Sequence, residues 1–235
     1  MKNKRLVQTK HRVAHKLSLS SSKQNRRAEP QLNRAEPIKW EKPTILIVCE
    51  GKNTEPSYFE QFKLSSATIK ALGNGNNTIS LVNQAIELNS KNSYDQVWCV
   101  FDKDSFAASN FNKAIKTAKA NGFGVAYSNQ SFEYWLILHF EDHQGGGMNR
   151  KDYSKTINEY INPLGAKYDG NGSKKISEEF FELLNGKSSN QEKSRIDLAI
   201  KRAKRNYNRF DHSNPAKEES STTVFLLIEE IQKYI

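Results

Sequence analysis

The sequence predicts an α/β fold, with a mostly parallel sheet flanked by helices and a helical extension after it. Two observations support this prediction. Unbroken apolar runs at residues 45–49 and 97–101 lack the alternation of a half-exposed strand, and such runs are typical of strands buried on both faces. Segments with helical spacing lie between successive strand-like runs, which is the pattern of parallel strands joined by right-handed crossovers.

Residues 1–40 are expected to form a disordered basic arm. They hold eleven Lys or Arg and two Glu, a net charge of +9, whereas the rest of the 235-residue chain holds 25 basic and 24 acidic residues, a net charge of +1. The arm has no apolar period, and a hydrophobic content of 36% for the whole chain is low for a globular protein. An arm of this kind either holds nucleic-acid phosphates non-specifically or acts as a solubilising tail.

Residues 41–145 are expected to form the α/β domain. The first strand runs into Glu50, Gly51 permits a tight turn, and Thr54, Glu55 and Pro56 are all tolerated or favoured where a helix begins. Apolar residues at helical spacing and turn residues such as Gly and Asn then delimit the remaining elements. We expect a short strand at 67–72, a turn at 73–77, a helix through 81–88, a strand at 95–101, a helix through 111–118, a strand at 123–127 and a helix at 131–140.

Residues 146–235 are expected to be a helical extension that packs on the core. The glycines at 145–147 suggest a boundary, and beyond them helices are predicted at 153–161, 176–184, 191–207 and 222–235. In the third of these helices, Lys201, Arg202 and Arg205 lie away from the apolar stripe. These three side chains form either a solvated helix face or a strip that grips a phosphate backbone.

Carboxylates follow two of the predicted strands. Glu50 lies at the carboxyl end of the first, where open α/β sheets bind their ligands. Asp102 and Asp104 follow the strand at 95–101, and side chains two residues apart in an extended chain point to the same side. If the two strands are neighbours, three carboxylates meet at one edge and repel each other unless a cation neutralises them. Oxygen ligands of this kind suit Mg²⁺ or Mn²⁺.

The acidic turns resemble those of the Toprim domain, which occurs in topoisomerases, primases and a group of metal-dependent nucleases. The wider pattern resembles the RloB-like family, which is named for its association with restriction-modification loci and abortive phage defence. The matching motifs span roughly residues 43–140. They are Glu50-Gly51-x-x-Thr54-Glu55-Pro56-x-Tyr58-Phe59, Asp102-x-Asp104 and Ser128-Asn129-x-x-Phe132-Glu133-x-Trp135-Leu136-x-x-His139-Phe140.

The resemblance implies a Toprim-like fold and a metal-dependent nuclease that hydrolyses phosphodiester bonds of DNA or RNA. In a two-metal scheme Asp102 and Asp104 would hold metal, and Glu50 would either bind metal or take a proton from the attacking water. Related nucleases place a further metal-site carboxylate on a comparable Ser-x-Glu segment, which makes Glu133 a candidate ligand. An acid in the first turn of a helix also has a purely structural explanation, and this applies to Glu133 and to Glu55.

Other residues and functions stay open at this level. Lys52 and Lys103 either meet phosphate charge or are ordinary exposed lysines. The resemblance further implies an effector of an anti-phage system, with a separately encoded ATPase as a possible partner. The alternative is a non-catalytic nucleic-acid-binding module of a defence complex, with structural acids. A phosphatase or phospho-acceptor domain is disfavoured, because the working Asp of such domains follows the first strand, where this chain has Glu50.

Three further expectations come from single residue types. Cys49 and Cys99 fall in core strands and are expected to be buried free thiols. His139 and His143 have the spacing of a helical zinc pair, but no third ligand is evident, so we expect a packed or an exposed histidine. The chain shows no signal peptide and no apolar run near twenty residues, which predicts a cytoplasmic protein without membrane contact.

Overall fold

The computed structural model describes residues 42–71, 78–104, 107–144, 146–148, 150–187 and 192–235. Residues 42–235 form one compact unit, which comprises both the predicted α/β domain and the predicted extension. The expected arm at 1–40, the expected turn at 73–77 and the glycine at 145 lie outside the described residues.

A mostly parallel sheet lies at the centre of this unit, as predicted. Within the described residues, five strands form the sheet: β1 (Ile45–Cys49), β2 (Ala67–Ala71), β3 (Gln96–Asp102), β4 (Gly124–Asn129) and β5 (Ser221–Thr222). Their order is β2-β1-β3-β4-β5, and the first four run parallel whereas β5 is antiparallel to β4. Strand β1, which Glu50 follows, and strand β3, which ends in Asp102, are therefore direct neighbours.

Both faces of the sheet are covered, which explains why the strand sequences do not alternate. All five residues of β1 are buried. Ile45 and Ile47 belong to one hydrophobic cluster, whereas Leu46 and Val48 belong to the cluster on the opposite face. Successive side chains of a strand point to opposite faces, so an unbroken apolar run is what burial on both faces requires.

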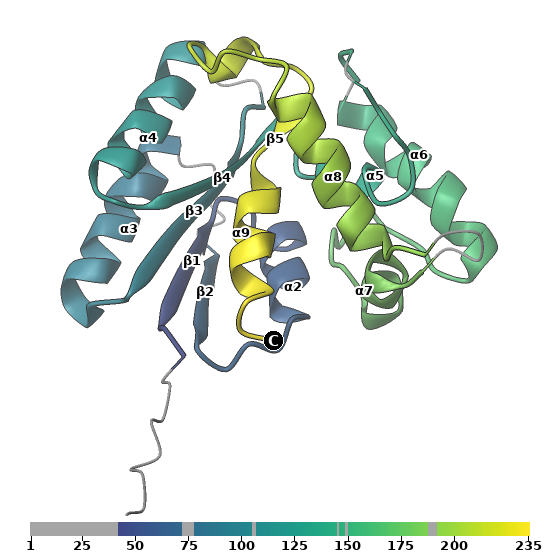
Figure 1. Cartoon of the computed structure of the whole chain (residues 1–235), viewed down its shortest axis with the longest axis horizontal. Coiled ribbons are helices and arrows are strands. Elements are labelled where there is room, and N and C mark those ends of the chain that lie inside the picture. Colours follow the sequence, from purple (N-terminus) through teal and green to yellow (C-terminus); the bar gives the residue numbers. More distant parts are fainter. Residues whose placement is uncertain (1–41, 72–77, 105–106, 145, 149, 188–191) are drawn as a thin grey trace, which may run out of the picture. The chain divides into compact units, whose positions relative to one another are not determined.

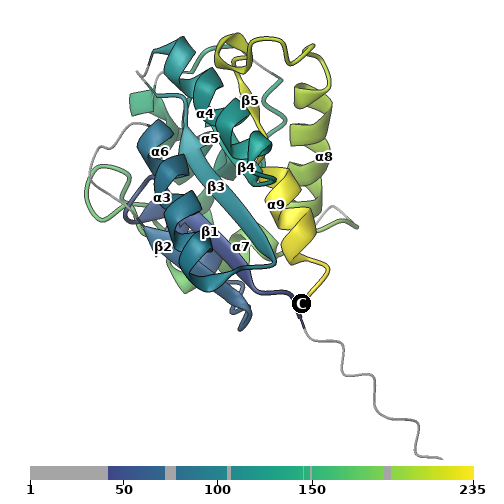
Figure 2. The same cartoon turned by 90° about the vertical axis from the view of Figure 1, so that its left-hand side faces the viewer.

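Helices form the two outer layers. The helices α3 (Thr78–Asn92) and α4 (Ala108–Ala120) contribute to the cluster of Leu46 and Val48, and Figure 2 shows them in front of the sheet. The other cluster takes residues from α2 (Thr54–Glu60), α5 (Glu133–Ile137), α6 (Arg150–Ile161), α7 (Glu178–Asn185), α8 (Arg195–Tyr207) and α9 (Val224–Ile231) (Figure 1). Short 3₁₀ turns lie at η1 (Asn162–Leu164) and η2 (Pro215–Lys217). No helix in the described part of the chain is long and apolar enough to cross a membrane.

Several predicted helices differ from the observed elements, and the helix expected at 191–207 begins only at Arg195. The expectation of a helix from Thr222 is wrong, because Thr222 belongs to β5 and α9 begins at Val224. The side chains of this segment bind the edge of β4: the Thr223 hydroxyl accepts the Tyr127 N–H at 2.9 Å and donates to the Val125 carbonyl at 3.0 Å. Thr222 Oγ1 donates to the Tyr127 carbonyl at 2.9 Å. The helix expected at 131–140 is also shorter, since α5 covers Glu133–Ile137.

Candidate functional site

A pocket of about 200 Å³ lies at the carboxyl edge of the parallel strands, where β1 and β3 end and where α2 and α5 begin. Three of the acids that the sequence singled out, Glu55, Asp102 and Glu133, line this one pocket, although they are distant in the chain. The complete lining consists of Gly51, Lys52, Asn53, Thr54, Glu55, Asp102, Phe132, Glu133 and Lys174. The pocket is where ligands of open α/β folds bind.

Glu50 and Asp102 are joined at this edge. The Glu50 N–H donates to the Val100 carbonyl at 2.9 Å, which extends the β1–β3 ladder by one residue. The Asp102 N–H in turn donates to Glu50 Oε2 at 3.2 Å. Glu50 is half-buried, and the Asp102 side chain is only 8% exposed. The predicted proximity of these two acids is therefore observed, with Glu50 beside the pocket and Asp102 in its wall.

The turn between β1 and α2 brings Glu55 back over Gly51. A Cβ atom at Gly51 would lie 2.2 Å from Glu55 Oε2, far inside van der Waals contact. Glu55 is 5% exposed, so its carboxylate occupies the space that a side chain at position 51 would need. Glycine leaves room for this close approach, and a side chain at position 51 would have to displace the Glu55 carboxylate. The sequence argument, which invoked only a tight turn, did not identify this reason.

The carboxylate of Glu133 accepts two hydrogen bonds from hydroxyl groups. Ser131 donates to Oε2 at 2.6 Å, and Tyr168 donates to Oε1 at 2.9 Å. The Tyr168 hydroxyl also lies 3.3 Å from Thr54 Oγ1. Burial raises the pKa of Tyr168 far above its ordinary value, and the neighbouring Glu133 and Glu55 carboxylates raise it further. Tyr168 thus stays a protonated donor, and it connects the extension to Glu133 in the pocket wall.

The extension also contributes Lys174 to the lining of the pocket. Its loop is fixed by Asp169, whose carboxylate accepts the N–H groups of Gly172 and Ser173 at 2.9 Å each and whose carbonyl accepts the Lys174 N–H at 2.9 Å. The N–H groups of Ser173, which contributes most, and of Gly172 lower the pKa of the Asp169 carboxyl group. Lys174 is half-buried in the pocket wall, opposite in charge to the acids there.

Tyr168 and Lys174 lie outside the span of 43–140 that carries the family-like motifs, and sequence reasoning missed both. The available signal was the run Asp169-Gly170-Asn171-Gly172, which marks a tight loop between helices. That signal locates a turn, but it does not say what the turn faces.

Asp104 and Lys103 follow β3 in a different way from the prediction. The expectation of an extended chain through Asp104 is wrong, because β3 ends at Asp102 and Asp104 has a left-handed φ of 43°. The chain bends toward β4, where the N–H groups of Lys103 and Asp104 donate to the carbonyls of Ser128 and Gln130 at 2.9 and 3.0 Å. The residues described as lining the pocket include neither Lys103 nor Asp104, whereas they do include the exposed Lys52.

The donor atoms of the pocket fit a hard divalent cation. Carboxylate oxygens from Glu55, Asp102 and Glu133 are the ligand type that Mg²⁺ and Mn²⁺ prefer. Within the described ranges, no group of three or more His, Cys, Asp or Glu residues is close enough to form a preassembled metal cluster. Mg²⁺ is usually bound through one or two carboxylates together with waters and substrate phosphates, so an incomplete protein cage suits this ion.

The basic residues of α8 have contacts within the protein. The Arg202 guanidinium donates to the Leu138 carbonyl at 2.7 Å, and Arg205 forms a two-pronged ion pair with Asp142. Partial burial lowers the pKa of Arg202, whereas the hydrogen bonds that Arg205 donates to Asp142 raise the pKa of Arg205. Lys201 is exposed. These contacts fasten α8 to the segment after α5, and a nucleic-acid role for the three residues stays a prediction.

The histidine and the thiols of the core are packed residues. His139 is buried, its Nδ1 lies 2.9 Å from the Trp135 carbonyl, and its ring meets the Trp135 ring edge-on at 4.8 Å. Burial lowers the pKa of His139 to about 3, so the ring is neutral at physiological pH. Cys49 and Cys99 are free and buried, as expected, and burial raises the pKa of Cys99 to about 12.

Comparison with known proteins identifies the family of this chain. The comparisons with curated proteins and with solved structures each give no match. A family model described as RloB-like protein matches residues 45–231, from the first residue of β1 to the last residue of α9. The match therefore covers the acidic pocket together with Tyr168 and Lys174 of the extension. The chain belongs to the RloB-like family.

Proposed function

We propose that this protein is a Toprim-type nuclease that hydrolyses phosphodiester bonds of nucleic acid with Mg²⁺ or Mn²⁺. One observation carries the proposal: Glu55, Asp102 and Glu133 line a single pocket at the carboxyl edge of the sheet, and Glu50 accepts a hydrogen bond from the Asp102 backbone beside it. Carboxylates that share one pocket repel each other, and the positive charge of a bound cation would offset this repulsion. The electrostatic repulsion among these acids is accounted for if the pocket binds a metal ion.

The protein's own residues divide into three roles. The carboxylates of Asp102 and Glu133, with Glu55, hold the cation, which when bound polarises the phosphate and lowers the pKa of water. Glu50, at the rim, either shares in binding the cation or takes the proton of the attacking water. Lys52 and Lys174 carry positive charge at the same pocket and meet the phosphate oxygens of the substrate.

The biological setting is proposed from family membership alone. RloB-like proteins are associated with restriction-modification loci and abortive phage defence, and this supports the role of effector in an anti-phage system. A separately encoded ATPase is the partner that this setting suggests. The competing function is a non-catalytic nucleic-acid-binding module, in which Glu50 would be no more than an acid at a strand end.

The experiment compares cleavage with binding in wild type and Glu50→Gln. Purified protein is incubated with plasmid DNA or with tRNA at one salt concentration, with Mg²⁺, Mn²⁺ or a chelator. We expect wild type to cleave one of the substrates only with a divalent cation. Glu50→Gln keeps the shape but removes the charge, so cleavage should fall by about 10²–10⁴-fold while nucleic-acid binding persists or tightens.

Two results contradict the proposal. Binding without cleavage under every cation condition would favour the binding module. A Glu50→Gln protein that cleaves at the wild-type rate would remove Glu50 from the chemistry. The melting temperature of both proteins serves as the control for folding.

A further inference from the structure

Tyr168 connects the helical extension to the acids of the pocket. It lies in the loop between η1 and α7, and its side chain is 1% exposed. Its hydroxyl donates to Glu133 Oε1 at 2.9 Å and lies 3.3 Å from Thr54 Oγ1. Glu133 belongs to α5 and Thr54 to α2, so one phenol group bridges the two helices whose first turns form the pocket wall.

The position of Tyr168 is fixed from behind. The side-chain amide of Asn158, on α6, donates to the Tyr168 carbonyl at 2.7 Å and accepts the Tyr168 N–H at 2.9 Å. The same amide donates to the Ser154 carbonyl one turn earlier at 2.9 Å, so the amide itself has little freedom to rotate. The Tyr168 ring packs on Phe180 of α7, with ring centroids 5.8 Å apart. Tyr168 is thereby attached to α6 through its backbone and to α7 through its ring.

The hydrogen bonds leave the Glu133 carboxylate oriented and able to bind a cation. Each of its oxygens accepts one hydroxyl, from Ser131 on one side and from Tyr168 on the other. A carboxylate oxygen has about two acceptor sites, so each oxygen retains capacity for a further ligand. Groups that hydrogen-bond a metal ligand fix its orientation, and their loss typically costs about 10–100-fold in metal affinity or activity.

We infer that Tyr168 is a positioning residue that holds the Glu133 carboxylate in the orientation needed to bind a divalent cation, an inference that rests on the proposed function. Tyr168 does not touch the reacting atoms, and its effect passes through Glu133. A variant without the hydroxyl therefore needs more metal to reach the same activity. Affinity for nucleic acid stays as it was, because the lysines of the pocket are unchanged.

The experiment measures Mn²⁺ binding by calorimetry without substrate, and the Mg²⁺ concentration that half-activates cleavage. Tyr168→Phe removes one hydroxyl and keeps the packed ring. The matched control is Tyr160→Phe, because the Tyr160 hydroxyl also donates to a glutamate, Glu141 at 2.7 Å, and that pair is not part of the pocket lining. We expect Tyr168→Phe to weaken Mn²⁺ binding and to raise the half-activating Mg²⁺ concentration by about 10–100-fold. Saturating Mg²⁺ should restore kcat with an unchanged KM for nucleic acid, and Tyr160→Phe should match wild type.

A second variant gives an independent measurement. Ser131→Ala frees the other carboxylate oxygen and should shift Mn²⁺ affinity in the same direction. If wild type binds Mn²⁺ and cleaves but Tyr168→Phe and Ser131→Ala bind Mn²⁺ equally well, the positioning role is refuted and the proposed function stands. If wild type neither binds Mn²⁺ nor cleaves, both fail together.

Discussion

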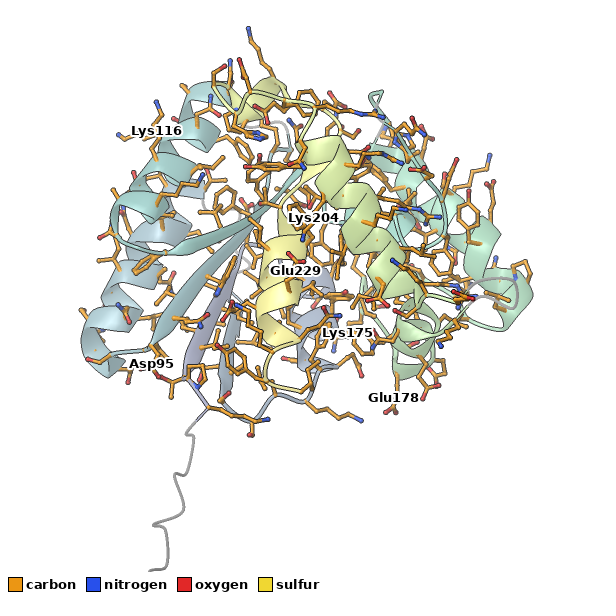
Figure 3. The ribbon with its side chains drawn as sticks, viewed as in Figure 1. Asp95, Lys116, Lys175, Glu178, Lys204 and Glu229 are labelled. Atoms are coloured by element: carbon orange, nitrogen blue, oxygen red, sulfur yellow. The ribbon has the colours of Figure 1, made fainter. Side chains whose placement is uncertain are left out.

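The two ends of β3 carry aspartates in opposite circumstances. Asp95 precedes the strand at the amino edge of the sheet, where Figure 3 labels it, and its side chain is exposed. Its Oδ2 accepts the backbone N–H of Thr44 at 2.7 Å and the Thr44 hydroxyl at 2.8 Å. Asp102 ends the strand at the carboxyl edge, buried in a pocket that it shares with Glu55 and Glu133.

The two acids differ in exposure and in neighbours, since Asp95 is exposed whereas Asp102 is buried beside other acids. Water and two hydrogen bonds stabilise the charge of Asp95, which joins the start of β1 to the start of β3. Asp102 has lost most of its contact with water and lies near other carboxylates, which is unfavourable for an anion. Under the proposed function, the positive charge of a bound cation offsets the repulsion between these acids.

The largest effect is expected from the same substitution at the two ends of the strand. Asp102→Asn keeps the size of the side chain but removes a cation ligand, and cleavage should fall below detection. Its melting temperature should equal or exceed that of wild type without metal, because one like charge is gone. The rise in melting temperature that Mg²⁺ gives to wild type by mass action should be lost. An Asp102→Asn protein that keeps this Mg²⁺-dependent rise would place the cation elsewhere.

A smaller effect is expected from Gly51→Ala. The added Cβ meets the end of the flexible Glu55 side chain, so the clash is relieved by moving that carboxylate. The cost in unfolding free energy should lie near the lower end of the roughly 1–3 kcal/mol of overpacked sites. Cleavage should drop by up to about 10²-fold, as for other small displacements in active sites.

The double variant Gly51→Ala/Glu55→Ala is the control for this clash. It should recover the lost unfolding free energy but not the activity, which chemical denaturation and cleavage assays can measure side by side. A double variant that is no more stable than Gly51→Ala would mean that the added methyl group clashes with something other than Glu55.

The smallest effect is expected from Asp95→Asn at the amino edge. The hydrogen bonds from Thr44, the backbone N–H first and the hydroxyl second, lower the pKa of Asp95 below its ordinary value. Its ionised form therefore adds stability above the unfolded pKa of about 3.9, and this stability is lost as the pH falls through the lower folded pKa. Asp95→Asn should be slightly less stable than wild type at pH 7, with a difference that shrinks in acid. Cleavage at pH 7 should not change. If Asp95→Asn lost cleavage as Asp102→Asn is expected to, the two edges of the sheet would not differ in function.

The central strands could be predicted because their residue types indicate how each strand is buried. The runs in β1 and β3 are apolar on both sides, which only a doubly covered strand explains, and this placed Glu50 and Asp102 at one edge. Strand β5 could not be predicted in this way. It consists of Ser221 and Thr222, two polar residues with no period, and its position depends on hydroxyl contacts with β4.

The residues around the pocket could likewise be predicted only in part, because some of their contacts join segments that are distant in the sequence. Asp102 was a candidate because it follows a strand, whereas Glu133 and Glu55 became candidates through the family resemblance and not through their positions in the first turn of a helix. Tyr168 is 35 residues from Glu133 and 114 residues from Thr54 in the sequence, and its neighbouring residues in the chain predict neither contact. The prediction of an extended chain through Asp104 was wrong for the opposite reason: a local rule was applied two residues beyond the end of β3 at Asp102.

The late position of β5 in the chain has a consequence for synthesis. Ser128 of β4 and its partner Thr222 are 94 residues apart. At about 5–20 residues per second, the ribosome needs roughly 5–20 seconds to make that interval. Throughout it the nascent chain has a strand edge with unpaired N–H and C=O groups, which can template pairing with another chain and so lead to aggregation. The two residues of β5 and the threonine that follows them end this exposure, although they add little to the hydrophobic core.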